Sequence, residues 1–161
     1  ASYQYVLVYD PAGPFVTGGG WFDAPASACP TLCSGNGANK AHFTVGAQFN
    51  ASRPDAPDGA MKFWLQGKKT LDVRTTTLTM LLAWDDRMQL WGPATMNGTP
   101  GYLLRISGLD GNGSGNAKGG AIRIELFDPS GARVYDTQWG APRDVAPTTA
   151  VQGGQLTIHP R

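Results

Sequence analysis

The sequence is poor in charge, in glutamate and in long apolar runs. Only 16% of its 161 residues are charged, and Glu125 is the sole glutamate. Long helix-forming side chains are therefore scarce, which argues against a helical bundle. No apolar run approaches the roughly 20 residues that a membrane-spanning helix needs. The formal net charge is +1 and the 13 cations are scattered, so the sequence gives no electrostatic basis for nucleic-acid binding.

The side chains that perform most enzyme chemistry are scarce as well. Two histidines are present, His42 on the expected polar face of a strand and His159 near the end of the chain. Neither accompanies a nucleophile motif, and nucleophilic catalysis needs a base beside the nucleophile. The only adjacent carboxylates, Asp85 and Asp86, fall in an expected hairpin turn, where they do not share one face as glycosidase carboxylates must. The sequence therefore predicts a protein that is not an enzyme and has no catalytic residues.

Glycine and proline are abundant, with 22 and 12 copies, and they fall between short apolar stretches. Apolar residues alternate with polar ones in several of these stretches, as in half-buried strands. The clearest are 42–49, 61–66, 78–82, 102–109, 122–127 and 156–158. Turn signals separate them at Pro57–Gly59, Asp85–Asp86, Asn97–Gly98 and Pro129–Gly131. This pattern predicts an all-β fold, an antiparallel β-sandwich or jelly roll of about ten strands.

Residues 3–9 also read as a strand, which ends in the stiff connector Pro11–Pro14. This strand belongs either to the sandwich or, as residues 1–10, to a preceding domain. We expect residues 11–161 to form a single module in both cases. If the strand's partner sheet lies elsewhere, its unpaired edge can recruit another chain and produce self-association.

Two stretches lack strand periodicity, residues 23–40 and 110–120, and loops of this length are usually functional or pinned. The first contains the only cysteines, Cys29 and Cys33. Two thiols do not complete a zinc site, and the nearby His42 adds only a third ligand. We therefore favour a local disulfide, formed in an oxidising compartment, over free thiols.

The second stretch places oxygen-bearing side chains at every second position, separated by glycines. Such side chains can surround a hard cation, and glycines permit the positive φ angles that the loop would need. Calcium is thus the one cofactor that the sequence suggests, but a neutral hairpin loop has the same composition. The candidate ligands are Asp110, Asn112, Ser114 and Asn116.

Five tryptophans raise the question of carbohydrate binding, because exposed indoles stack on sugar rings. Trp64 is out of phase with the apolar Phe63, and Trp91 is out of phase with Met88 and Leu90. Both are candidate stacking platforms for a glycan or another surface polymer. The alternative is that they pack in the core or under loops, where sandwich domains often bury tryptophan.

The order of several motifs resembles a known family. The stretch Tyr5–Pro11 followed by Phe15–Trp21 looks like the junction between a PKD (immunoglobulin-like) domain and the module that follows it in many bacterial extracellular proteins. Four later segments fit that module in order: Trp91–Gly98, Gly101–Gly111, Ile122–Asp128 and Gly153–His159. The cysteine-containing stretch 24–40 departs from the pattern, and so does Ala121, where we expect an acidic or aromatic residue.

The resemblance implies a non-catalytic structural or interaction module at the C-terminal end of a bacterial secreted or surface protein. Its expected partners are other domains of the same protein. The alternative that we carry forward is a sandwich that binds a carbohydrate or surface polymer and is stabilised by calcium.

Overall fold

The computed structural model describes residues 13–33, 39–67, 70–113 and 117–159. The predicted strand 3–9 and the boundary near residue 10 lie outside these residues. One 3-10 turn, η1 (Ala26–Ala28), accompanies eleven strands. The strands are β1 (Phe15–Ala24), β2 (Asn39–Asn50), β3 (Arg53–Leu65), β4 (Leu71–Thr75), β5 (Met80–Trp84), β6 (Arg87–Met96), β7 (Thr99–Leu109), β8 (Ala121–Phe127), β9 (Arg133–Asp136), β10 (Thr149–Ala150) and β11 (Gly153–His159).

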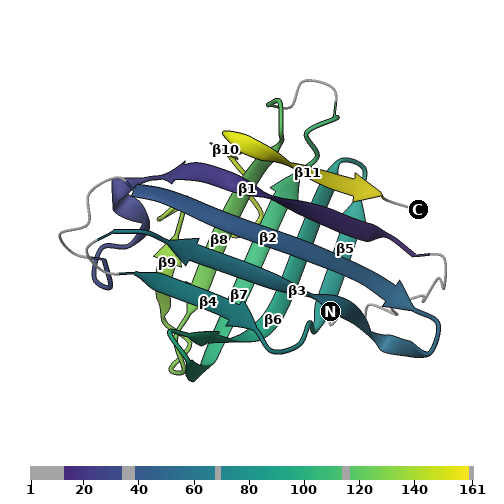
Figure 1. Cartoon of the computed structure of the whole chain (residues 1–161), viewed down its shortest axis with the longest axis horizontal. Coiled ribbons are helices and arrows are strands. Elements are labelled where there is room, and N and C mark those ends of the chain that lie inside the picture. Colours follow the sequence, from purple (N-terminus) through teal and green to yellow (C-terminus); the bar gives the residue numbers. More distant parts are fainter. Residues whose placement is uncertain (1–12, 34–38, 68–69, 114–116, 160–161) are drawn as a thin grey trace, which may run out of the picture.

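All eleven strands belong to one antiparallel sheet, which confirms the predicted all-β class. The main path runs β10-β8-β7-β6-β4-β3-β2-β1-β11, with β5 beside β6 and β9 beside β8. The sheet folds over on itself, so that β11, β1, β2, β3 and β4 form a front layer across β5 to β9 (Figure 1). The strands of the two layers cross at a steep angle (Figure 1), as in orthogonal sheet packing.

The core lies between the layers and follows from the alternation of side chains along each strand. Phe22, Phe43 and Phe63 enter it from the front layer, and all are fully buried. The back layer contributes Leu104, Ile106, Ile122, Ile124 and Leu126, which are also fully buried. The ring of Phe63 lies 4.6 Å from that of Tyr135 on β9, so the two layers are in direct contact.

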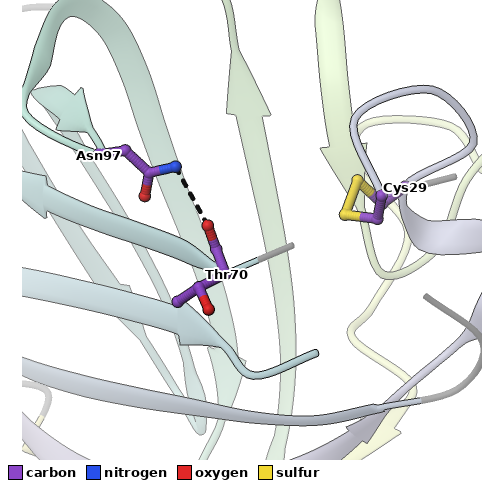
Figure 2. Close-up of a disulfide and its surroundings, with 4 residues drawn as sticks. Cys29, Thr70 and Asn97 are labelled. Carbon is purple, nitrogen blue, oxygen red and sulfur yellow. Dashed lines mark hydrogen bonds between the residues drawn. A yellow bond between two sulfur atoms is a disulfide. The ribbon is translucent and has the colours of Figure 1, made fainter. Parts of the chain in front are cut away.

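The layers are joined where β4 pairs with β3 on one edge and with β6 on the other. Asn97 holds this junction together. It lies in the predicted Asn97–Gly98 turn between β6 and β7, where its backbone adopts a positive φ of 49°. Its side chain accepts a hydrogen bond from the backbone of Asp72 at 2.8 Å. It also donates one to the carbonyl of Thr70 at 3.1 Å (Figure 2). A turn of the back layer thereby holds the first residues of a front-layer strand.

Residues 110–113 and 117–120 lie beside the outer edge of β11. Gly111 donates a backbone hydrogen bond to Leu156, and Leu156 donates one to Gly119. This loop leaves the back layer at the end of β7 and returns at the start of β8, so it links the two layers opposite the β4 junction. An edge strand with unpaired backbone groups invites aggregation, and these hydrogen bonds occupy part of the outer edge of β11.

The predicted turn at Pro57–Gly59 is wrong, because these residues lie within β3. The chain reverses earlier, at Ala51–Ser52, between β2 and β3. Gly59 has a φ of 137°, and a Cβ there would lie against the carbonyl of Gly46 on β2. The glycine therefore allows close approach of two paired strands, a requirement that looks like a turn signal in sequence.

Candidate binding face

A row of aromatic side chains crosses the outward face of the front layer. Trp21 on β1 is opposite His42 on β2, which is opposite Trp64 on β3. Each alternates along its strand with a buried phenylalanine, so each projects away from the core. All three side chains are partly exposed. We call these residues, together with Lys40 and Lys62, the front strip.

The rings of the front strip are held by their neighbours rather than left as free platforms. The rings of His42 and Trp64 are stacked, with centroids 4.9 Å apart and planes 8° from parallel. The Lys62 ammonium lies 4.6 Å from the centroid of Trp64, and the Lys40 ammonium lies 3.9 Å from that of Trp21. Cation–π contacts of this kind are worth about 0.5–1 kcal/mol when exposed.

Trp21 also lies against the edge strand β11. A Cβ at Gly153 would lie against the indole of Trp21, so only glycine lets this ring approach the backbone so closely. The aromatic ring shields a glycine in the strand, a device that stabilises sheet edges. One side of the indole therefore faces the Gly153 backbone, and the ammonium of Lys40 lies over the ring.

The row ends on β4 at Asp72, which is opposite Trp64. Arg74 donates two hydrogen bonds to the Asp72 carboxylate, at 2.9 and 2.8 Å. These hydrogen bonds lower the pKa of Asp72, and the positive charges of Arg74 and Lys62 act in the same direction. Both side chains of this pair remain substantially exposed, so solvent screens their attraction.

A shallow depression of about 260 Å³ lies at the other end of the same layer. It forms beside Gly46, where a Cβ would meet nothing within 4 Å. Thr17, Gln48 and Asp58 contribute polar groups to its lining, and Phe15 contributes an apolar wall. Phe15 is itself stacked on His159, with ring centroids 3.9 Å apart. A hollow with polar and apolar walls therefore opens at this end of the front layer.

The outward face of the back layer carries a buried ion network. Arg105 on β7 pairs with Glu125 on β8 at 2.8 Å, and Arg123 pairs with Asp136 on β9 at 2.8 Å. Arg133 reaches both acids, at 3.4 and 2.9 Å. The side chains of Arg105, Glu125, Arg123 and Asp136 are at most 1% exposed. Hydrogen bonding to Asp136 raises the pKa of Arg123, whereas burial lowers that of Arg105.

Residues 137–148, which we call the strap, cover this network. Arg123 donates hydrogen bonds to the carbonyls of Pro142 and Ala141, at 2.7 and 3.1 Å. Arg105 donates one to the carbonyl of Arg143 at 3.3 Å. Gln138 closes the strap on itself, because its amide donates to Ala146 and accepts from Thr148. The buried guanidinium groups thereby hold an irregular segment against the sheet.

Trp91, the second predicted stacking platform, lies beside this network and not on the front strip. Its ring contacts the guanidinium groups of Arg105 and Arg143, at 4.8 and 5.6 Å from the centroid. Phe127 lies nearly parallel to it at 6.5 Å. The indole N–H is buried and has no hydrogen-bond partner among the described residues. The structure therefore separates Trp64 and Trp91 onto opposite faces of the molecule.

Sequence reasoning did not find the ion network. Arg105, Arg123 and Glu125 stand at outward positions of their strands, and such positions usually face water. The only signal was the cluster of three charged residues on two adjacent strands of a chain that has few charges. Their burial depends on the strap, whose path no periodic pattern describes.

The four candidate calcium ligands are only partly described, since Ser114 and Asn116 lie outside the described residues. Asp110 is buried, and its two carboxylate oxygens accept backbone hydrogen bonds from Asn112 and Ile158, at 2.7 and 2.8 Å. Asn112 accepts a hydrogen bond from Gln155 at 3.1 Å. These contacts fasten the loop to β11. Within the described ranges, no three His, Cys, Asp or Glu residues cluster in a way that could hold a metal.

Cys29 and Cys33 form the predicted disulfide, with their Cα atoms 5.2 Å apart (Figure 2). Both are buried and belong to the hydrophobic core, so the bond ties residues 29 and 33 of the first irregular stretch to the core. A disulfide is compatible with an oxidising, extracytoplasmic environment. No helix among the described residues is long and apolar enough to cross a membrane.

Comparisons with family models, with curated proteins and with solved structures each found no match to this chain.

Proposed function

We propose that this chain is a non-catalytic interaction module of a bacterial secreted or surface protein, and that the front strip makes its contact. The observation that carries the proposal is the outward, partly exposed position of Trp21, His42 and Trp64. These aromatic side chains project away from a core that is already filled by Phe22, Phe43 and Phe63. Aromatic residues gathered at outward positions are a recurrent feature of recognition surfaces.

Two further features support a location outside the cell. The Cys29–Cys33 disulfide suits an oxidising compartment. The motif order that resembles the module after PKD domains favours a place beside other domains of the same protein, which would be its first partners. Calcium plays no part in this proposal, because the described oxygens of Asp110 already bond to backbone N–H groups.

The proposal is tested by binding of the fluorescently labelled module to intact bacterial cells and to a glycan array. We expect the double variant Trp21→Ala, Trp64→Ala to lose binding. Trp139→Ala is the matched control, because Trp139 is 42% exposed but lies on the strap. Circular dichroism and a melting curve check that each variant folds. Binding that survives the double variant, or that disappears equally in the control, would contradict the proposal.

A purely structural module is the second candidate, and the buried ion network favours it. The disulfide, the strap and the capped edge of β11 all stabilise the domain without creating a binding surface. A structural module predicts that changes to the front strip alter no interaction at all. The same cell-binding and array experiment therefore distinguishes the two candidates.

A further inference from the structure

We propose that the front strip binds an anionic polysaccharide, a linear polymer of carboxylate-bearing sugars, laid across strands β1 to β4. The inference rests on the proposed function and names the ligand class of the same surface. It follows from three observations: the occupied ring faces, the unpaired lysines, and the neutral polar side chains around them.

The faces of the Trp21 and Trp64 rings decide which ligands these residues can bind. A neutral sugar stacks on a free aromatic face. His42 occupies one face of Trp64, and Lys62 and Lys40 place ammonium groups over Trp64 and Trp21. The stacked rings stand on neighbouring strands and are partly exposed, so solvent reaches them beyond the stacked faces. The edge of an aromatic ring carries partial positive charge, which attracts anions and oxygen acceptors.

Unpaired cations reinforce this preference. Neither Lys40 nor Lys62 forms an ion pair with any residue in the described part of the chain. Lys40 comes two residues before His42 on β2, and Lys62 comes two residues before Trp64 on β3. Because β2 and β3 are antiparallel, the two lysines lie on opposite sides of the aromatic row. Asp72 is neutralised by Arg74. Asp23, whose position on β1 is opposite Lys40, places an opposing charge beside the strip.

The rest of the surface suits hydroxyl-rich ligands. Thr17, Thr44 and Gln155 are exposed at outward positions near the row and offer neutral donors and acceptors. Gly19 and Gly46, on the same face, add no side chain above the strands. An open sheet surface accommodates an extended polymer, and the depression beside Gly46 lies at the other end of the layer, away from the aromatic row. Three strand spacings separate β1 from β4, about 14 Å, which is enough for several sugar units.

The probe is polygalacturonate, with dextran as the neutral polysaccharide and single-stranded DNA as a polyanion without uronic acid. Binding is measured by calorimetry or affinity electrophoresis at low and at high salt. We expect polygalacturonate to bind, dextran not to bind, and high salt to weaken the complex because exposed charges are screened. DNA should bind more weakly than polygalacturonate.

Matched variants locate the interaction. Lys40→Gln with Lys62→Gln should weaken polygalacturonate binding at least about tenfold, a loss equivalent to about 1.4 kcal/mol. Lys118→Gln is the control, because Lys118 is exposed on the 110–120 loop and outside the front strip, and it should bind as the parent does. Asp23→Asn removes the opposing charge and should tighten binding.

Three results would overturn the inference: equal binding of dextran, equal or tighter binding of DNA, or a lysine double variant that binds like the parent. These results leave the proposed function intact if the Trp21→Ala, Trp64→Ala variant still loses binding to bacterial cells. If that tryptophan variant keeps its cell binding, the proposed function fails as well. The two failures are therefore distinguishable.

Discussion

The two outward faces of this folded sheet carry the same kinds of side chain, but the ion pairs are exposed on one face and buried on the other. On the front layer, Asp72 and Arg74 pair at 2.8 Å with side chains 35% and 61% exposed. On the back layer, Arg123 and Asp136 pair at the same distance, and both are essentially fully buried. An exposed pair contributes about 0–1 kcal/mol. A buried pair must compensate for lost hydration, and each partner depends on the other.

The difference between the faces comes from the chain that follows β9. The strap passes over the back layer and supplies carbonyl acceptors for Arg105 and Arg123. No described segment lies over the front strip in this way, so its rings and lysines stay partly exposed. The covered face stabilises the domain, and the exposed face is the one that we propose makes contacts.

The largest expected effect is on the covered face. Glu125→Gln removes a carboxylate that faces three arginines, and Arg105 then loses its only ion pair within the described part of the chain. We expect a loss of about 3–5 kcal/mol in the free energy of unfolding, because an uncompensated charge remains buried. Urea unfolding measures it. The control is Asp72→Asn on the open face, with an expected loss below about 1 kcal/mol. Equal losses in the two variants would contradict the contrast.

The next effect concerns the loop that joins the back layer to β11. Asp110→Ala removes two charged hydrogen bonds to backbone N–H groups. We expect it to lower the free energy of unfolding by about 2–3 kcal/mol. Chelator should leave the melting temperature of the parent protein unchanged, since a calcium ion that bound only the native state would raise it. A melting temperature that falls with chelator would show that the loop holds a cation.

The disulfide should stabilise the domain without affecting recognition. It closes a loop with a sequence separation of four, for which loop-closure entropy gives about 2 kcal/mol. Cys29→Ser with Cys33→Ser should therefore melt several degrees lower, as should the reduced parent in differential scanning calorimetry. Binding through the front strip should persist below the melting temperature. Loss of binding in the folded variant would tie the cysteine loop to the binding face.

The smallest effect lies between the layers, at Tyr135. Burial raises its pKa above that of an unfolded tyrosine, about 10, so the native state holds the phenol neutral. Its contribution to stability is fully present below that pH. Above it, the unfolded state ionises and stability falls by about 1.4 kcal/mol per pH unit.

Tyr135→Phe should remove this alkaline loss and cost little at neutral pH, because the buried hydroxyl has no partner among the described residues. The free energy of unfolding in urea is measured at pH 7 and at about pH 11 for this variant and for the parent. Tyr102→Phe, at a partly exposed position, is the control. An identical alkaline loss in the parent and in Tyr135→Phe would contradict the assigned cause.

Local patterns predicted the fold class and the Asn97–Gly98 turn, because alternation and turn chemistry are properties of neighbouring residues. They also predicted the disulfide. They placed Trp64 on an outward face correctly, since Phe63 beside it enters the core. The partners of Trp64 were not predictable, because His42 comes from another strand and the register is set by the whole sheet.

The same limit explains why the surroundings of Trp91 and the burial of the ion network were not predictable from local patterns. Trp91 is also out of phase with the core, as its neighbours Met88 and Leu90 indicated. It stays partly exposed, but the guanidinium group of Arg143 lies over its ring, and Arg143 belongs to the strap, which is distant in sequence and irregular in conformation. Outward orientation can be predicted from periodicity, but exposure depends on what else packs there.

The tryptophans themselves provide the most direct test of the contrast between the faces. Trp21 and Trp64 lie on the front strip, Trp91 lies by the ion network, and Trp139 lies on the strap. Titration of the labelled protein with polygalacturonate can be followed by the indole N–H signals in two-dimensional NMR. We expect the signals of Trp21 and Trp64 to shift while those of Trp91 and Trp139 stay in place. Shifts confined to Trp91 and Trp139 would contradict it.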